Sequence, residues 1–106
     1  MAKEKTTTRA RSLDNILATL RDHLPELRER YGVTSLGVFG PYVQGRQRKR
    51  SDMDVLVEFG HAPTLFRFID LQEELSALLG VKVDLVSRKA LNGEIGMRIL
   101  EEVIAL

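Results

Sequence analysis

Three short apolar runs with the length and composition of β-strands constrain the fold of this chain most. They cover residues 34–39, 54–59 and 81–86, and Gly40 and Gly60 directly follow the first two. Apolar runs of this length that end at glycine are typical of strands. Segments with helical spacing lie before, between and after them. We therefore expect one α/β (α+β) domain, with a small mixed β-sheet of about three to four strands flanked by helices.

Apolar residues recur at three- and four-residue steps in three segments, which are predicted helices. The first has its apolar residues at positions 13–27, with Ser12 as the expected N-cap and Gly32, after Tyr31, as the expected C-terminal stop. Pro25 lies inside it and costs about 3 kcal/mol in a helix interior, so we expect either a kinked helix or two helices that meet just before it. The second helix spans residues 63–79, and the third spans residues 95–104.

Length and hydropathy set the domain organisation. A chain of 106 residues, 43% of them hydrophobic, is expected to form one domain. Residues 1–11 are polar and lack apolar spacing, so we expect a flexible N-terminal arm before a domain at residues 12–106. No stretch reaches the ~18 apolar residues of a membrane span, and the N-terminus lacks the apolar segment of an export signal. We expect a cytoplasmic protein with no membrane partner.

The charge balance restricts the binding partners. The chain has 16 basic and 15 acidic residues. It has no cysteine, and this absence excludes disulfides, thiolate metal sites and thiol nucleophiles. A net charge of +1 gives no overall attraction to nucleic acid. Residues 46–50 (RQRKR) are a local exception with four cations. They form either a solvated loop or a surface that steers ATP, RNA or an acidic partner.

Two aspartates at the start of the second apolar run are candidate metal ligands. Asp52 and Asp54 are two residues apart, so strand geometry places both carboxylates on one face. Carboxylates held in this way repel each other unless a cation lies between them, and oxygen-only ligands suit Mg²⁺ or Mn²⁺. The alternative is structural: Asp52 caps a turn after Ser51, and Asp54 is a solvated start of the strand.

A third aspartate interrupts the last apolar run. Asp84 alternates onto one strand face together with Lys82 and Val86, as either a sheet-surface residue or a third ligand. If this strand is next to the strand of Asp54, three carboxylates converge at one sheet face, as two-metal phosphoryl chemistry requires. Glu58 shares the strand face of Asp54 and is a further candidate neighbour of the metal.

The segment after the first strand is a candidate phosphate site. Gly40 ends the strand, Pro41 suits the first position of a helical turn, and Gly45 lies five residues after Gly40. A strand-to-helix junction offers backbone N–H groups and a positive dipole end to phosphate. An ordinary turn is the alternative. Tyr42 is a candidate for stacking on a nucleobase or for modification, although a position on a helix surface is the more common one.

The motif as a whole resembles a known family. Gly40, Gly45, Ser51, Asp52 and Asp54 match the G-S-x-x-x-G and S-D-x-D stretch of DNA polymerase β-like nucleotidyltransferases. More closely, the chain resembles the minimal nucleotidyltransferases (MNT) that act as antitoxins to HEPN toxins in prokaryotes. This resemblance runs from residue 13 to residue 106 and includes SDMDVLVEF, VDLV and the closing RILEEVIAL. It implies the nucleotidyltransferase fold.

The resemblance also implies a reaction, a cofactor and a partner. Asp52 and Asp54 would bind Mg²⁺, and Asp84 would complete the metal site and help to activate the attacking hydroxyl. The chain would be a protein adenylyltransferase that transfers AMP from ATP to a tyrosine of a cognate HEPN-type toxin, as part of a hetero-oligomer. The implied nucleotide-binding residues are Gly40, Pro41, Tyr42, Gly45, Arg46 and Ser51.

One position departs from the family motif. Pro41 stands where the family has serine, which removes a hydroxyl and a backbone N–H near the triphosphate. Each lost donor to a charged oxygen costs ~1.5–3 kcal/mol. One alternative is therefore a catalytically weakened domain that neutralises the toxin by direct binding. Another is a nucleic-acid-binding module that uses residues 46–50, which the near-neutral total charge disfavours.

Overall fold

The computed structural model describes residues 12–46 and 52–106. The expectations for residues 1–11, for Ser51 and for most of the basic run 46–50 lie outside the described residues. The elements in chain order are α1 (Leu13–Tyr31), β1 (Val33–Phe39), α2 (Pro41–Gln44), β2 (Met53–Phe59), α3 (Leu65–Leu79), β3 (Val83–Ser87), the 3₁₀ turn η2 (Arg88–Ala90), α4 (Gly93–Glu102) and β4 (Ile104–Ala105).

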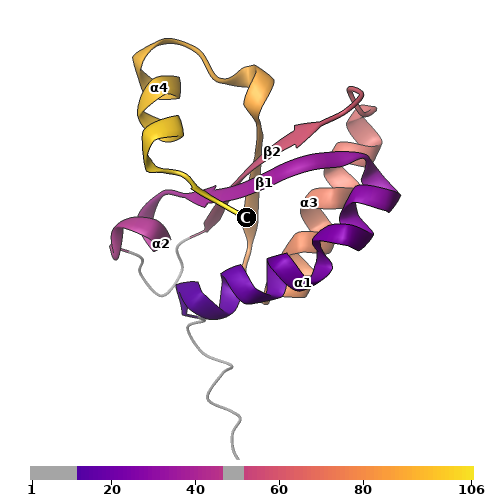
Figure 1. The fold of residues 1–106 in the computed structure, drawn as a ribbon, viewed down its shortest axis with the longest axis horizontal. Coiled ribbons are helices and arrows are strands. Elements are labelled where there is room, and N and C mark those ends of the chain that lie inside the picture. Colours follow the sequence, from indigo (N-terminus) through magenta and orange to yellow (C-terminus); the bar gives the residue numbers. More distant parts are fainter. Residues whose placement is uncertain (1–11, 47–51) are drawn as a thin grey trace, which may run out of the picture.

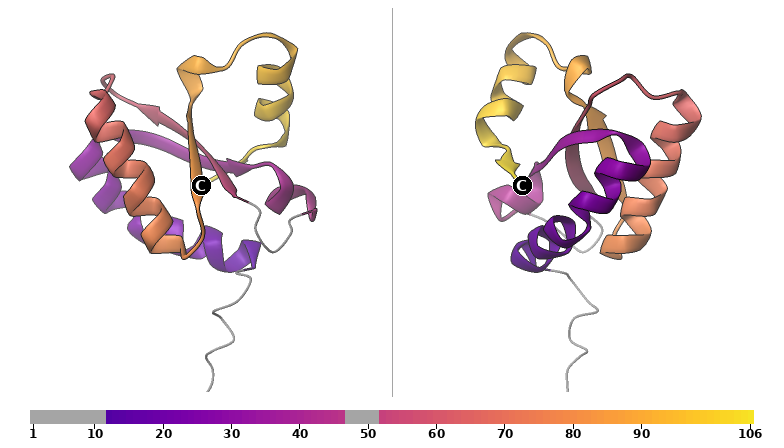
Figure 2. Two further views of the ribbon diagram at one scale, coloured as in Figure 1. Left: turned by 180° about the vertical axis from the view of Figure 1, so that it is seen from behind. Right: turned by 45° about the vertical axis from the view of Figure 1, so that its right-hand side comes forward.

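The strands form one mixed sheet in the order β3-β2-β1-β4. β1 is antiparallel to both β2 and β4, whereas β2 and β3 are parallel. Helices α1 and α3 lie side by side on one face of the sheet (Figure 1). The shorter α4 stands apart from them, on the other side (Figure 2). The expected α/β class, with three to four strands in a mixed sheet, is confirmed.

The hydrophobic core lies between the sheet and the two long helices. Helical spacing gives α1 and α3 one apolar stripe each, and alternation gives each strand one buried face. Each buried aliphatic side chain contributes roughly 1.5–3 kcal/mol. The fully buried side chains with the largest volume are Ile16, Leu20, Leu27, Met53, Leu71, Leu75 and Leu79. Within the described ranges, no helix has the length and apolar character needed to span a membrane.

Pro25 does not divide the first helix. α1 is continuous from Leu13 to Tyr31, so the expectation of two separate helices is wrong. Leu24 and Leu27 on either side of the proline are buried in the core, and this packing offsets the lost hydrogen bond. The predicted N-cap is confirmed, because the hydroxyl of Ser12 accepts a hydrogen bond from the backbone N–H of Asn15 at 3.2 Å.

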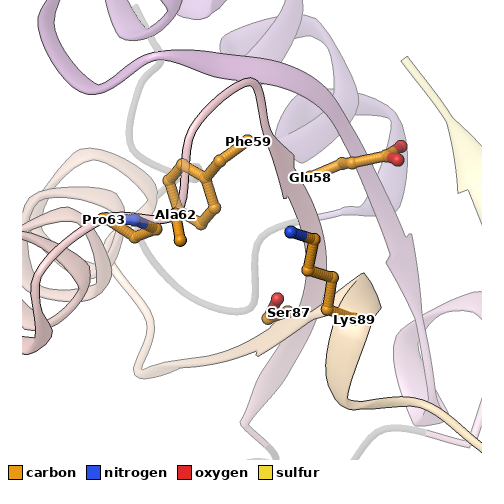
Figure 3. Close-up of a pocket in the computed structure, with 6 residues that line it drawn as sticks. All are labelled: Glu58, Phe59, Ala62, Pro63, Ser87 and Lys89. Carbon is orange, nitrogen blue, oxygen red and sulfur yellow. The ribbon is translucent and has the colours of Figure 1, made fainter.

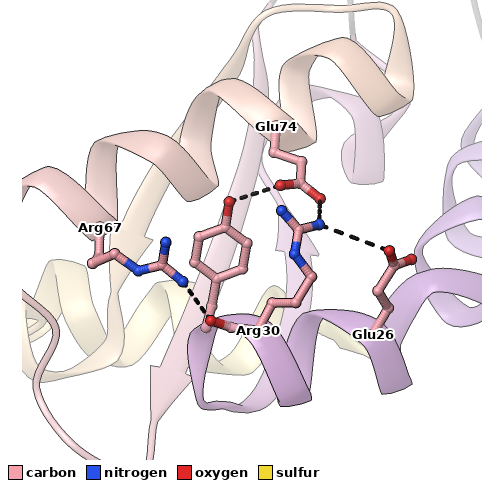
Figure 4. A network of polar contacts seen from close by, with 5 residues as sticks. Glu26, Arg30, Arg67 and Glu74 are labelled. Carbon is pink, nitrogen blue, oxygen red and sulfur yellow. Dashed lines mark hydrogen bonds and ion pairs between the residues drawn. The ribbon is translucent and has the colours of Figure 1, made fainter.

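A polar network joins the end of α1 to α3 (Figure 4). Glu74 accepts hydrogen bonds from the Arg30 guanidinium at 2.6 Å and from the Tyr31 hydroxyl at 2.7 Å. Arg67 lies over the Tyr31 ring, 4.4 Å from its centroid, and donates to the carbonyl of Arg30. Burial, followed by the bond to Glu74, raises the pKa of Tyr31 and keeps its hydroxyl protonated. These contacts fix the two helices beside each other.

The last element is the short strand β4, and the helix before it, α4, ends earlier than expected. The expected helix over residues 95–104 ends at Glu102, and Ile104 pairs with Val38 at the free edge of β1. Gly37 makes this approach possible, because a Cβ atom there would lie 2.6 Å from Cγ2 of Val103. Pairing with an open strand edge satisfies backbone groups that a longer helix would leave exposed.

Side chains of α3 hold the outer edge of β3. The backbone N–H of Leu85 donates to Oε1 of Gln72, and that of Val83 donates to Oγ of Ser76, both at 2.9 Å. β3 is an edge strand whose outward N–H groups would otherwise lack strand partners. The two side chains therefore fix the position of the strand that carries Asp84.

We predict that Gln72→Leu lowers the free energy of unfolding by about 1–3 kcal/mol, since it leaves the N–H of Leu85 without an acceptor. Urea unfolding measures this change, and amide hydrogen exchange at Leu85 locates it. Gln72→Glu is the matched control, because it keeps an acceptor oxygen at the same place. Equal protection of the Leu85 amide in both variants would contradict the role of Gln72.

Candidate active site

The register of the parallel strands brings two of the candidate aspartates together. Asp54 of β2 is paired in register with Asp84 of β3, so both side chains leave the same face of the sheet. Asp52 lies two residues before Asp54, immediately ahead of β2, and strand alternation directs it to that face as well. Asp54 is half-buried, while Asp84 on the edge strand is exposed. The condition set in the sequence analysis, that these two strands are neighbours, is therefore met.

The three carboxylates leave negative charge uncompensated. The pKa of Asp54 is raised from 3.8 to about 6, first by burial and then by the charges of Asp84 and Asp52. No lysine or arginine in the described ranges forms an ion pair with any of the three. A group of like charges without a protein counter-ion is suited to an external cation.

The donor set fits a metal that is shared with a substrate. No three acidic, histidine or cysteine side chains in residues 12–46 and 52–106 are arranged to hold a metal ion by themselves. Mg²⁺ does not require such a cage, because it usually takes one or two carboxylates, several waters and substrate phosphates. Asp54 together with Asp52 or Asp84 supplies the carboxylates that this kind of site needs.

Gly40 brings the backbone against Asp54. It has φ of 86° and ψ of −158°, a region that is essentially restricted to glycine. A Cβ atom at this position would lie 2.1 Å from Oδ2 of Asp54. The end of β1 therefore reaches the candidate metal ligand only because residue 40 has no side chain. This contact gives the first motif glycine a steric role that its sequence position alone did not indicate.

The strand-to-helix junction is present, but it offers few N–H donors. Gly40 is the N-cap of α2 and Pro41 is its first residue, which has no N–H group. The N–H groups of Val43 and Gln44 both donate to the Gly40 carbonyl, at 3.0 and 3.1 Å. At the other end of α2, Gly45 is the C-cap with φ of 72°. Pro41 thus contributes no donor to this turn, and the N–H groups of Val43 and Gln44 already have an acceptor.

Tyr42 and Arg46 are two further residues of the expected nucleotide site. Tyr42 is only 5% exposed and packs in the core, so the expected helix-surface position is wrong, and burial leaves its ring little access to a base. Arg46 is exposed and donates to Oε1 of Gln44 at 2.6 Å, and Gln44 donates to Glu102 of α4 at 3.0 Å.

Glu58 lies at the other end of β2 from Asp54. It forms an ion pair with Arg88 at 3.4 Å and accepts a hydrogen bond from Ser35 at 3.3 Å. Its position four residues beyond Asp54 in β2, about 13 Å along the strand, separates Glu58 from the candidate metal ligands. The sequence pattern did not identify Arg88 as its partner, since the contact joins residues that are far apart in the chain.

We predict that Asp54→Asn stabilises the metal-free protein at about pH 8. The folded-state pKa lies above the ordinary value, so ionisation of Asp54 costs stability as pH rises from about 4 through 6. The full shift corresponds to ~3 kcal/mol, and solvent screening of this half-exposed group reduces it to about 1 kcal/mol. Urea unfolding at pH 8 and pH 4 measures the difference, which should be absent at pH 4. A stabilisation of equal size from Asp70→Asn, an exposed carboxylate on α3, would contradict a local effect.

We also predict an energetic coupling between Gly40 and Asp54. Gly40→Ala should cost about 3 kcal/mol or more in the wild-type chain, from backbone strain and from collision with the carboxylate. In an Asp54→Ala background the collision is absent, and the same change should cost at least about 1 kcal/mol less. A double-mutant cycle by urea unfolding tests this expectation. Additive effects within about 0.5 kcal/mol would show that the two residues do not interact.

Comparison with known proteins identifies the family. The model of the nucleotidyltransferase domain family matches residues 20–106. The protein named protein adenylyltransferase MntA, from Thermococcus cleftensis, is 47% identical over 93 residues, which cover 88% of this chain and 94% of that protein.

Solved structures agree with this result. The structure of a candidate minimal nucleotidyltransferase is 36% identical, with a TM-score of 0.74 over 90% of this chain and 96% of that chain. A chain in a mutant of the MntA–HpeT toxin–antitoxin complex is 25% identical, with a TM-score of 0.63 over 88% of this chain and 69% of that chain. The resemblance noted in the sequence is therefore confirmed. This chain belongs to the nucleotidyltransferase domain family and, within it, to the minimal nucleotidyltransferases related to the MntA antitoxins.

Proposed function

We propose that this nucleotidyltransferase transfers AMP from ATP to a tyrosine of a cognate HEPN-type toxin, in a reaction that depends on Mg²⁺. The observation that carries this proposal is the alignment of Asp54 with Asp84 across β2 and β3, with Asp52 two residues away. A cluster of carboxylates on a rigid sheet face, without a cationic partner in the described chain, is the donor set of phosphoryl-transfer sites.

Each aspartate has a role that follows from its position. Asp52 directly precedes β2 and Asp54 is its second residue, beside the end of β1, so both carboxylates are placed to bind a metal next to the triphosphate. A bound divalent cation would supply charge neutralisation at the α-phosphate and orient it for in-line attack. Asp84 lies on the exposed edge strand, where an acceptor from another protein has access to it.

The reaction balances with these groups. The phenolic oxygen of the acceptor tyrosine attacks the α-phosphorus of ATP, and a new oxygen–phosphorus bond forms. The bond between that phosphorus and the oxygen that bridges to the β-phosphate breaks, and pyrophosphate leaves. Asp84 accepts the phenolic proton. At neutral pH a bound cation favours ionised Asp54, because it opposes the burial and repulsion that raise its pKa to about 6.

The triphosphate binds, on this proposal, at the turn that begins with Gly40 and ends with Gly45, with help from Arg46 and from Ser51. Pro41 weakens that binding, because the turn lacks one N–H group and two others already donate to the Gly40 carbonyl. We expect the metal, held by the aspartates, to provide most of the affinity for ATP. We therefore expect the enzyme to show transfer activity at a raised ATP concentration.

Two observations support a protein substrate. The relative from Thermococcus cleftensis, with 47% identity, is named a protein adenylyltransferase. A structure with 25% identity is a toxin–antitoxin complex. The same complex also supports a second candidate function, in which the chain neutralises the toxin by binding alone. The restricted phosphate turn at Pro41 is the observation in its favour.

We predict that incubation with the HEPN-type protein encoded beside this chain, together with ATP and Mg²⁺, raises the intact mass of that protein by whole AMP units. Mass spectrometry measures the shift, and tandem spectra should assign the modification to tyrosine. Chelation of the metal should abolish the shift, because the carboxylates cannot position the α-phosphate alone.

The control variant is Asp52→Asn/Asp54→Asn, which removes both charges with little change in volume. It should leave the partner mass unchanged while the complex still forms. If the wild-type chain forms a stable complex but never changes the partner mass, the transfer reaction is wrong and neutralisation by binding takes its place. A Pro41→Ser variant that gains transfer activity would show that this residue had removed it.

A further inference from the structure

The last segment of the chain brings a further carboxylate to the turn that follows β1. β4 is antiparallel to β1, and Ile104 lies opposite Val38. Continued by two residues, this register places Glu102, the last residue of α4, level with Gly40. The contacts agree with this placement, because the side-chain amide of Gln44, at the end of α2, donates to the Glu102 carboxylate at 3.0 Å.

Two hydrogen bonds in series link this carboxylate to Arg46. The Gln44 amide donates to Glu102 through Nε2, and its Oε1 accepts from the Arg46 guanidinium at 2.6 Å. A carboxylate only accepts and a guanidinium only donates, so a single orientation of the amide satisfies both neighbours. The backbone N–H of Arg46 also donates to the Pro41 carbonyl, at 2.8 Å. Both the backbone and the side chain of Arg46 are therefore held against the turn.

The neutral amide orients Arg46 without cancelling its charge. No acidic side chain in residues 12–46 and 52–106 forms an ion pair with Arg46, and its side chain is exposed. A guanidinium has further N–H donors beside the one that Gln44 accepts, and these suit phosphate oxygens. A direct ion pair with Glu102 would orient the guanidinium as well, but it would compete with an anionic ligand. The turn thus carries an oriented cation whose charge is available.

The hollow in Figure 3 is too far from Asp54 to offer this cation instead. Glu58 and Lys89 are among the residues that line it, and Glu58 lies four residues beyond Asp54 in β2, about 13 Å along the strand. A phosphate at Lys89 could not share a metal with Asp54, because bonds from oxygen to Mg²⁺ are only about 2.0–2.1 Å long. The turn that leads to Arg46, in contrast, begins at Gly40, directly against the Asp54 carboxylate.

We propose that Glu102 is a positioning residue for triphosphate binding, an inference that rests on the proposed use of ATP. Glu102 fixes the amide of Gln44, and this amide fixes the guanidinium of Arg46 for contact with the phosphates. Pro41 makes this contact more important, because it leaves the first position of α2 without an N–H donor. The end of α4 thereby contributes to nucleotide binding through Gln44.

The test measures the Kd of the full chain for a non-hydrolysable ATP analogue with Mg²⁺ by calorimetry, which does not require transfer activity. We expect Glu102→Leu to raise the Kd about threefold or more, as the loss of one hydrogen bond of modest strength does. Glu102→Gln keeps an acceptor oxygen, so its Kd should be no higher than that of the wild type. The loss of a negative charge alone acts in the opposite direction, because it favours an anionic ligand.

Two further variants separate positioning from a general structural effect. Glu101→Leu makes the same change at an exposed neighbour on α4 and should not raise the Kd. In an Arg46→Ala background the series of hydrogen bonds has lost its end, so Glu102→Leu should cause no further increase. In the transfer assay, Glu102→Leu should raise the KM for ATP by the same factor as the Kd and leave kcat within about twofold.

The outcomes separate this inference from the proposed function. If the wild-type chain does not bind the analogue with Mg²⁺, the proposed use of ATP is wrong and the positioning role is wrong with it. If the wild-type chain binds the analogue and Glu102→Leu keeps the wild-type Kd, only the positioning role is wrong. An equal increase in Kd with and without the Arg46 side chain would show that Glu102 does not act through Arg46, and would also overturn the inference.

Discussion

The parallel pairing of β2 with β3 is the constraint on which the rest of the structure depends. It aligns Asp54 with Asp84, and a shift of one residue would send one of the two carboxylates to the buried face. Gln72 and Ser76 of α3 hold the outer edge of β3 through its backbone N–H groups. The pairing has an energetic cost, because it gathers like charges and raises the pKa of Asp54 to about 6. Local instability of this kind is common where a protein prepares a binding site.

The hydrophobic core, which offsets the energetic cost of gathering these charges, lies on one face of the sheet only. α1 and α3 bury one face of the sheet, while the opposite face carries the aspartates and α4 (Figure 1). This division leaves the functional face free of the main packing. Gly37 in β1 allows close approach to β4, and Gly40 directly after β1 allows close approach to Asp54. Both positions are constrained by space, and Gly40 is also constrained by its backbone conformation.

Much of this arrangement could be predicted from sequence, because it depends on local periodicity. Alternation placed Asp52 and Asp54 on one face, and apolar spacing located α1 and α3. Features set by distant contacts could not be predicted. The strand at Ile104 forms only because the edge of β1 is free, and it shows helical spacing in the sequence. Tyr42 is buried because α2 folds against the sheet. The bond from the Leu85 N–H to Gln72 could not be predicted, because it forms only when β3 packs beside α3 and glutamine is common on helix surfaces.

The most direct test of the account is the position of the metal. A crystal of the chain with Mn²⁺ and a non-hydrolysable ATP analogue, measured by anomalous scattering, would locate the cation without reference to activity. We expect a peak with carboxylate oxygens of Asp52 and Asp54 at about 2.0–2.2 Å and an α-phosphate oxygen in the same shell. A well-ordered nucleotide whose metal contacts none of the three aspartates would contradict the central claim that β2 and β3 build the catalytic site.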